Sequence, residues 1–159
     1  METELVSIEL EVNKIIYKRT VRASITLLDF LREHLGLKGT KRGCDSGQCG
    51  ACTIIMDGKT MNACLVLAIQ ADGKKILTIE GLSSGGRLHP LQEAFVEEGA
   101  VQCGFCVPGM ILSAKALLDE KKDPSEEEIR EALSGNLCRC TGYVKIIKAV
   151  QKAAAVMRA

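Results

Sequence analysis

The cysteines in the first half of the chain constrain its fold more than any other feature. Three of them lie in the run GCDSGQCGAC at residues 43–52, spaced C-x4-C-x2-C, and Cys64 follows shortly after. This spacing is typical of a loop that wraps a [2Fe–2S] cluster. Gly43, Gly47 and Gly50 fit such a loop, because a tight bend around an inorganic core needs positive φ angles and close backbone approach. We therefore predict one cluster with the ligands Cys44, Cys49, Cys52 and Cys64.

Three basic residues lie just upstream of this loop, namely Lys38, Lys41 and Arg42. Positive charge there would favour an anionic cluster. The same residues would equally form a solvated basic face. The sequence leaves both interpretations open.

A second set of cysteines occupies two short motifs far apart in the chain. VQCGFCVPGM contains Cys103 and Cys106, and GNLCRCTGY contains Cys138 and Cys140. Each pair lies next to a predicted helix start, where unpaired N–H groups and the positive end of the helix dipole stabilise thiolates. Two helix ends could therefore hold a second [2Fe–2S] cluster.

Other uses of the eight cysteines have to be weighed. Four cysteines in two short pairs can also bind tetrahedral zinc, and for the second set alone the two metals stay equally open. The x4 spacing in a glycine-rich loop favours iron-sulfur over zinc for the first set. Disulfides are disfavoured because the N-terminus METELVSIEL does not resemble a secretory signal, which predicts a reducing, cytoplasmic location.

Composition excludes several functional classes. The chain of 159 residues is 47% hydrophobic and 26% charged, as in ordinary globular proteins. Only 3% of its residues are aromatic, which leaves few rings for base stacking, and its net charge of +1 gives little positive charge for binding phosphates. We therefore expect no nucleic-acid partner. Its apolar runs are too short to predict a membrane span.

The sequence of the first half predicts several strands and one helix. Apolar residues flank Asn13 and Lys14 as in a β-hairpin, and Thr26 with Asp29 opens a helix over residues 26–35. Further strands follow the cysteine loop, which together give a small α+β domain. The Gly- and Ser-rich stretch at 81–90 predicts a domain boundary.

The sequence of the second half predicts four short helices, which implies a helical bundle. Pro90 follows His89 as a predicted N-cap, Pro108 opens the second helix, and Ser125 with Glu128 forms a capping box. The last helical run follows GNLCRCTGY. We predict an α+β chain with a first domain at 1–80, a linker at 81–89 and a helical domain at 90–159.

Three motifs in this order, GCDSGQCGAC, QCGFCVPGM and NLCRCTGY, resemble the iron-sulfur subunit of the molybdenum hydroxylases. That family includes xanthine dehydrogenase, carbon monoxide dehydrogenase, nicotinate dehydrogenase and 4-hydroxybenzoyl-CoA reductase. The resemblance covers roughly residues 4–155. It implies a ferredoxin-like β-grasp domain followed by a four-helix bundle domain, each with one [2Fe–2S] cluster.

The resemblance also implies partners and roles. The cluster of the helical domain would lie next to a molybdopterin cofactor on a large subunit, with Gln102 bonded to the pterin and Cys140 the closest ligand. The other cluster would face FAD on a medium subunit, in a dimer of heterotrimers. One departure is Val107, where the family commonly has Thr, which predicts a slightly altered potential or loop contact.

We therefore expect an electron-transfer subunit of an oxidoreductase, without a catalytic site of its own. A free ferredoxin-like carrier and a zinc-stapled interaction module are the alternatives. The sequence does not indicate the substrate or the direction of electron flow.

Overall fold

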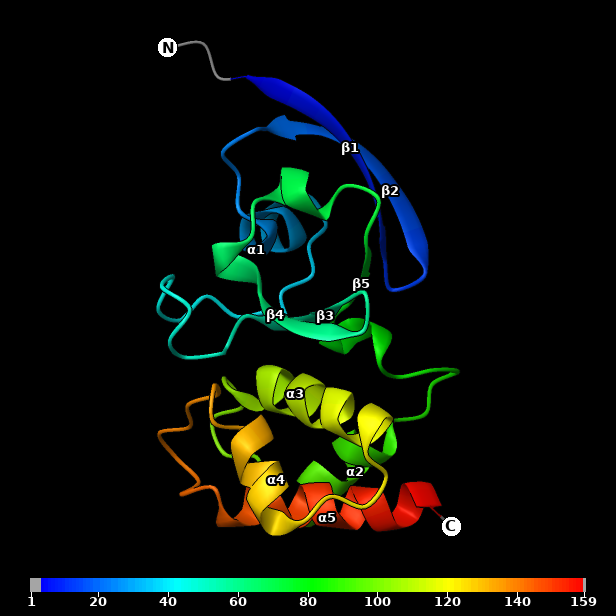
Figure 1. Ribbon diagram of the computed structural model, residues 1–159, viewed down its shortest axis with the longest axis vertical. Helices are drawn as coiled ribbons and strands as arrows, with labels where there is room; N and C mark the ends of the chain where they lie inside the picture. The colour runs from blue at the N-terminus through cyan, green and yellow to red at the C-terminus, as the bar shows by residue number, and fades with distance from the viewer. Residues whose placement is uncertain (1–3, 159) are drawn as a thin grey trace.

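A computed structural model of the chain describes residues 4–158. Its long axis separates a half built on a β-sheet from a half built of helices (Figure 1). Residues 1–3 of the predicted first domain and residue 159 of the second lie outside the described residues.

The chain begins with the predicted hairpin. Strands β1 (Leu5–Val12) and β2 (Ile15–Arg22) pair antiparallel along their whole length. Asn13 and Lys14, with φ angles of 53° and 69°, form the two-residue turn between them. Positive φ at both positions matches the right-handed twist of the strands, which confirms the sequence prediction.

The hairpin forms one edge of a five-stranded sheet with the order β2-β1-β5-β3-β4. The remaining strands are β3 (Thr53–Met56), β4 (Lys59–Asn62) and β5 (Lys75–Leu77). β5 runs parallel to β1, while the other neighbours are antiparallel. A parallel pair needs a long crossover connection, and the first cysteine loop lies within this one, between the helical segment and β3.

The helical segment over the sheet differs from the single helix predicted at 26–35. It begins as predicted, with the Thr26 hydroxyl accepting the Asp29 amide at 3.0 Å. After one turn, α1 (Leu27–Asp29) continues as the π-helical η1 (Phe30–His34). An apolar pattern over ten residues cannot distinguish these two helical pitches, because both place the same side chains on the sheet.

The second half contains the four predicted helices. Their bounds are α2 (Pro90–Glu97), α3 (Val107–Glu120), α4 (Glu126–Ala132) and α5 (Val144–Arg158). The predicted caps are confirmed: His89 Nδ1 accepts the Leu91 amide at 3.2 Å, and Ser125 and Glu128 bond each other's backbone. Short 3₁₀ turns connect other elements, namely η2 (Ala63–Leu65), η3 (Ala68–Ala71) and η4 (Ile79–Gly81).

Each half has its own hydrophobic core. Leu27, Leu28 and Phe30 pack against the sheet in the first. Phe95, Met110 and Ile146 lie at the centre of the second. α3 packs against β3 and joins the halves (Figure 1). Within residues 4–158, none of the helices is both long and apolar enough to cross a membrane.

Candidate metal centres

The first cysteine loop folds its backbone amides around one sulfur atom. Cys44 Sγ accepts hydrogen bonds from the amides of Ser46 at 3.4 Å, Gln48 at 3.3 Å and Cys49 at 3.4 Å. Such a concave set of N–H groups binds anions. Hydrogen bonds, first from Ser46 and then from Cys49, lower the pKa of Cys44 to about 6. The loop thus favours a thiolate before any metal binds.

Cys52 and Cys64 complete the first set from the edge of the sheet. Cys52, 2% exposed, precedes β3, and its carbonyl accepts the Ala63 amide at 3.2 Å, so that Cys64 lies beside it. Burial raises the pKa of Cys52 to about 12, so this thiol needs a bound metal to lose its proton. Gly43 leaves room for Cys49, since a Cβ at Gly43 would lie 2.6 Å from Cys49 Sγ.

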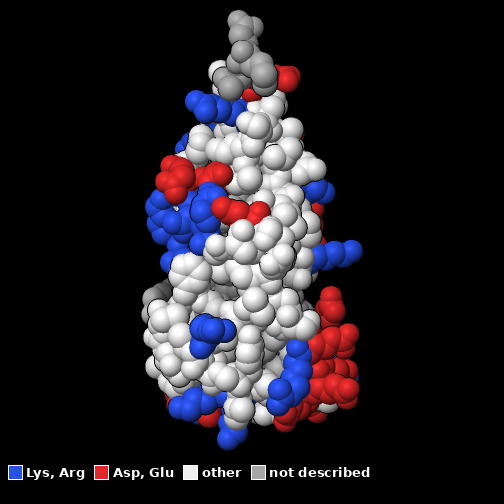
Figure 2. Space-filling model, turned by 90° about the vertical axis from the view of Figure 1, so that its left-hand side faces the viewer, with Lys and Arg blue, Asp and Glu red and all other residues white. Residues whose placement is uncertain are grey.

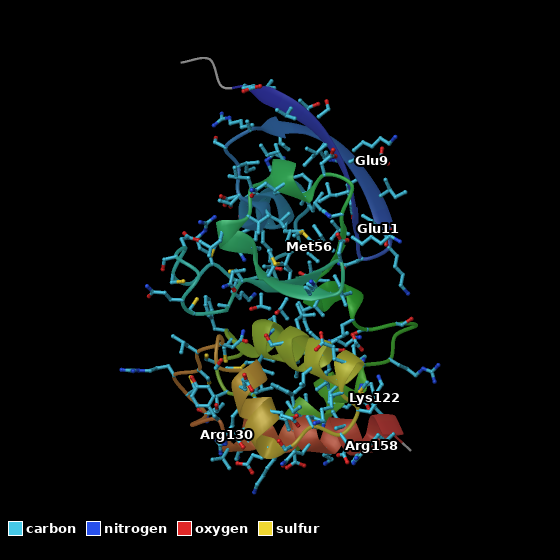
Figure 3. All side chains as sticks on the ribbon, in the orientation of Figure 1. Glu9, Glu11, Met56, Lys122, Arg130 and Arg158 are labelled. Carbon is cyan, nitrogen blue, oxygen red and sulfur yellow. The ribbon has the colours of Figure 1, made fainter. Side chains whose placement is uncertain are left out.

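The second set comes together from two separate connections. The sulfurs of Cys103 and Cys140, both exposed, lie 3.5 Å apart. Cys106 is buried beside Cys138, and burial raises its pKa to about 12. Thr141 donates its hydroxyl to Cys138 Sγ at 3.1 Å. In Figure 3 the yellow sulfur atoms gather at the two loops on one side of the molecule.

The pairing of thiols distinguishes between the two metals. A single zinc ion at about 2.3 Å from four sulfurs would bring every sulfur within about 4 Å of the other three. A [2Fe–2S] cluster needs only two cysteines on each iron. Cys103 contacts Cys140, and Cys106 contacts Cys138. Two close pairs of thiols therefore fit the two irons of a binuclear cluster.

Two of the upstream basic residues, Arg42 and Lys38, pair with carboxylates. Arg42 pairs with Asp29 and, at 2.6 Å, with Asp45, while Lys38 pairs with Glu33 at 3.0 Å. Their charges are largely neutralised by neighbouring carboxylates. This arrangement agrees with a solvated charged face and not with direct stabilisation of the cluster.

The two cysteine loops are in direct contact. The Leu137 amide donates to the Cys49 carbonyl at 2.9 Å, and the Asn136 side chain donates to the Gly50 carbonyl at 2.9 Å. The first loop therefore bonds through the predicted ligand Cys49 itself. The second bonds through Leu137, the residue just before the predicted ligand Cys138.

Sequence reasoning missed one supporting residue near Cys138, the buried Asn136. Asn136 is 4% exposed, and the Tyr143 hydroxyl accepts the Cys138 amide at 2.8 Å. Tyr143 adopts a φ of 69°, which is unusual for an aromatic residue and indicates a constrained position. The place of Asn136 next to a cysteine motif was a signal, but an Asn after Gly135 looks like an ordinary turn residue.

Comparisons with known proteins agree with this geometry. Residues 12–78 match the family of 2Fe-2S iron-sulfur cluster binding domains, and residues 78–151 match a [2Fe-2S] binding domain family. The chain is 58% identical to the nicotinate dehydrogenase small FeS subunit of Eubacterium barkeri, over 80% of this chain and 81% of that protein. It is 52% identical to the nicotine 6-hydroxylase small subunit of Paenarthrobacter nicotinovorans, over 93% of this chain and 89% of that protein.

The structural match is equally extensive. Quinoline 2-oxidoreductase from Pseudomonas putida 86 superposes with a TM-score of 0.94 at 47% identity, over 97% of this chain and 96% of that chain. The chain belongs to the iron-sulfur subunits of the molybdenum hydroxylases. Aldehyde oxidoreductase from Desulfovibrio gigas, with a TM-score of 0.92 and 49% identity, matches 96% of this chain but only 17% of its own length. In this family the same fold is thus also part of a longer polypeptide.

The residues assigned by family resemblance lie on the surface of this iron-sulfur subunit. Gln102 and Cys140 are exposed; Gln102 precedes Cys103 in the chain, and Cys140 contacts Cys103. Val107 is the first residue of α3 and packs against the helical core.

Proposed function

We propose that the chain relays electrons between a molybdopterin site on a large subunit and FAD on a medium subunit. Each [2Fe–2S] cluster, when bound, supplies one-electron redox chemistry. The observation that carries the proposal is the hydrogen bond of 2.9 Å from the Leu137 amide to the Cys49 carbonyl. It links the backbone of Cys49 directly to the residue before Cys138, so the two cysteine loops are joined by a main-chain hydrogen bond.

The exposure of the ligands supports the proposed order of partners. Cys103 and Cys140 are exposed next to Gln102, as a site that meets an external pterin would require. Cys44 in the other loop is partly exposed, and we assign that loop to the FAD side. By resemblance the holoenzyme would be a cytoplasmic dimer of heterotrimers.

The surface around the loops supports contact with partner proteins. In Figure 2 the middle of the face that carries both loops is mostly uncharged, apart from a basic group in its lower part. Large apolar side chains are exposed beside the cysteines: Leu65, Val101, Phe105, Leu137 and Val144. Apolar surface of this kind is typical of protein interfaces.

We also propose that the chain is divided as the sequence indicates, into a β-grasp domain at 1–80, a linker at 81–89 and a four-helix bundle domain at 90–159. The two separate hydrophobic cores and the family boundaries at residue 78 support this division.

The test is to purify the protein anaerobically with any accompanying subunits. We would count iron, sulfide and zinc, and record electron paramagnetic resonance (EPR) spectra after reduction. Four irons per chain, two distinct [2Fe–2S] signals and co-purified molybdopterin and FAD subunits are expected. Zinc without such signals would overturn the relay, and a lone chain with both clusters and full activity would replace it with a free carrier.

A further inference from the structure

A buried amide joins the two halves between the cysteine loops. The Nδ2 of Asn136 donates to the Gly50 carbonyl at 2.9 Å and to Thr53 Oγ1 at 3.1 Å, and its Oδ1 accepts the Ser113 hydroxyl at 2.7 Å. The residue is 4% exposed. One side chain from the helical half thereby bonds two residues of the sheet half.

The bonds of this amide fix its orientation. The Gly50 carbonyl can only accept, so it must face the Nδ2 of Asn136, and the Oδ1 is then left to accept from the Ser113 hydroxyl. Thr53 uses its own hydroxyl hydrogen on the Gly50 carbonyl at 2.7 Å, so its oxygen is left to accept from Asn136. The network therefore permits one arrangement of these groups.

The two halves also approach closely through their backbones at the same place. A Cβ at Gly50 would lie 2.2 Å from the Gly135 carbonyl oxygen, and a Cβ at Gly109 would lie 2.3 Å from the Gly50 carbonyl oxygen. Three segments thus meet at the first loop through their main chains. Gly50 lies between Cys49 and Cys52, and Gly135 and Asn136 precede Cys138.

We infer that Asn136 is a positioning residue that fixes the distance and relative orientation of the two clusters. This inference rests on the proposed function, since it requires both clusters. An apolar residue at this position would allow the halves to pack at several offsets, whereas a satisfied buried amide specifies one. Transfer between the clusters depends steeply on their separation, so a small shift at this contact would slow it.

The experiment uses the full chain with its accompanying subunits and two substitutions, Asn136→Ala and Asn136→Asp. Asn136→Asp keeps the bond from Ser113 but removes the donor and places a carboxylate oxygen against the Gly50 carbonyl. We would measure the magnetic interaction between the two reduced clusters by EPR, as line splitting or faster spin relaxation, and the rate of electron passage between them. Both are expected to decrease while the iron content is unchanged.

The chain offers a matched control in Asn62. Its Nδ2 donates to the Gly47 carbonyl at 3.0 Å, so it binds the same cysteine loop, but from within the sheet half. Asn62→Ala is expected to leave the interaction between the clusters as in the wild type. A general loosening of the loop would instead affect both variants equally.

The outcomes separate this inference from the proposed function. Wild-type protein without two [2Fe–2S] signals would overturn the relay itself. Two signals with an unchanged interaction and rate in Asn136→Asp, or an equal loss in Asn62→Ala, would overturn only the role of Asn136. If both Asn136 variants lose iron, Ser113→Ala decides: it removes the hydrogen bond to Asn136 Oδ1 and so loosens the side chain. It is expected to weaken the interaction, and an unchanged value would refute the inference.

Discussion

The two sets of cysteines are held in different ways. The first lies mainly in the loop at 43–52, and the second lies in two separate connections of the helical half. In the first, Cys44 lies among three amides of its own loop, and the β3–β4 hairpin already brings Cys52 close to Cys64. In the second, Cys106 and Cys138 are separated by α3 and α4 and meet only when these helices pack. One site is therefore assembled by local structure and the other by tertiary structure.

This difference teaches where a bound cluster would matter for stability. A cross-link stabilises a protein mainly by restricting the unfolded chain, and it adds little where the folded chain already closes the loop by itself. The first cluster would then act mostly as a redox group. The second would also staple a helical half that is too small to gain much stability from its core alone.

The largest expected effect comes from removing one ligand at each site. Cys106→Ser should release the second cluster and lower the free energy of unfolding of the helical half by about 3–4 kcal/mol, because it opens the loop that contains α3 and α4. Cys44→Ser should release the first cluster with a much smaller loss. Iron analysis and denaturant unfolding of both variants check this, and equal losses of stability would refute the comparison.

The contact between the sites can be broken at Gly50. Gly50→Ala should destabilise the protein by about 2–4 kcal/mol, because it combines a strained φ of 66° with a clash against the Gly135 carbonyl. Gly58→Ala is the matched control, with a φ of 83° but no atom within 4 Å of the added Cβ. Gly58→Ala should lower the free energy of unfolding by about 1 kcal/mol. Denaturant unfolding of both variants measures the difference.

Mild acid should weaken the cap of α2 in the helical half. Burial, and then the charge of Lys115, hold the pKa of His89 below its ordinary value of 6.5, and His89 must be neutral to cap α2. The unfolded chain binds this proton more readily, so the contribution is complete above pH 6.5 and is lost as the pH falls through the lower folded value.

His89→Asn tests this, because Asn caps the helix without titrating. Its unfolding temperature should fall less than that of the wild type between neutral and mildly acidic pH, by an amount corresponding to about 1 kcal/mol or less. Identical pH profiles for His89→Asn and the wild type would contradict the assignment.

The smallest effect concerns the electronic environment of the second site. Val107→Thr introduces a hydroxyl directly after the ligand Cys106, at the first turn of α3. A new hydrogen bond there should shift the midpoint potential of the second cluster slightly and leave the first unchanged, since potentials depend on hydrogen bonds to the sulfurs. Redox titration followed by EPR would show the shift, and identical potentials would sink the prediction.

Much of this protein was determined by local sequence. The turn at Asn13 and the cap at Ser125 each depend on neighbours a few residues away, so the pattern alone predicted them correctly. The ligand roles of the eight cysteines themselves remain predictions that iron analysis of the substituted proteins would test.

Only the tertiary structure decided which residues distant in the chain come together. The parallel pairing of β1 with β5, the pairing of Cys103 with Cys140, and the bonds of Asn136 to Gly50 join residues distant in the chain. Such contacts form because side chains and backbones fit together in space, and no periodicity or spacing encodes that fit. Asn136 in particular looks like a turn residue until the packing of α3 on β3 buries it.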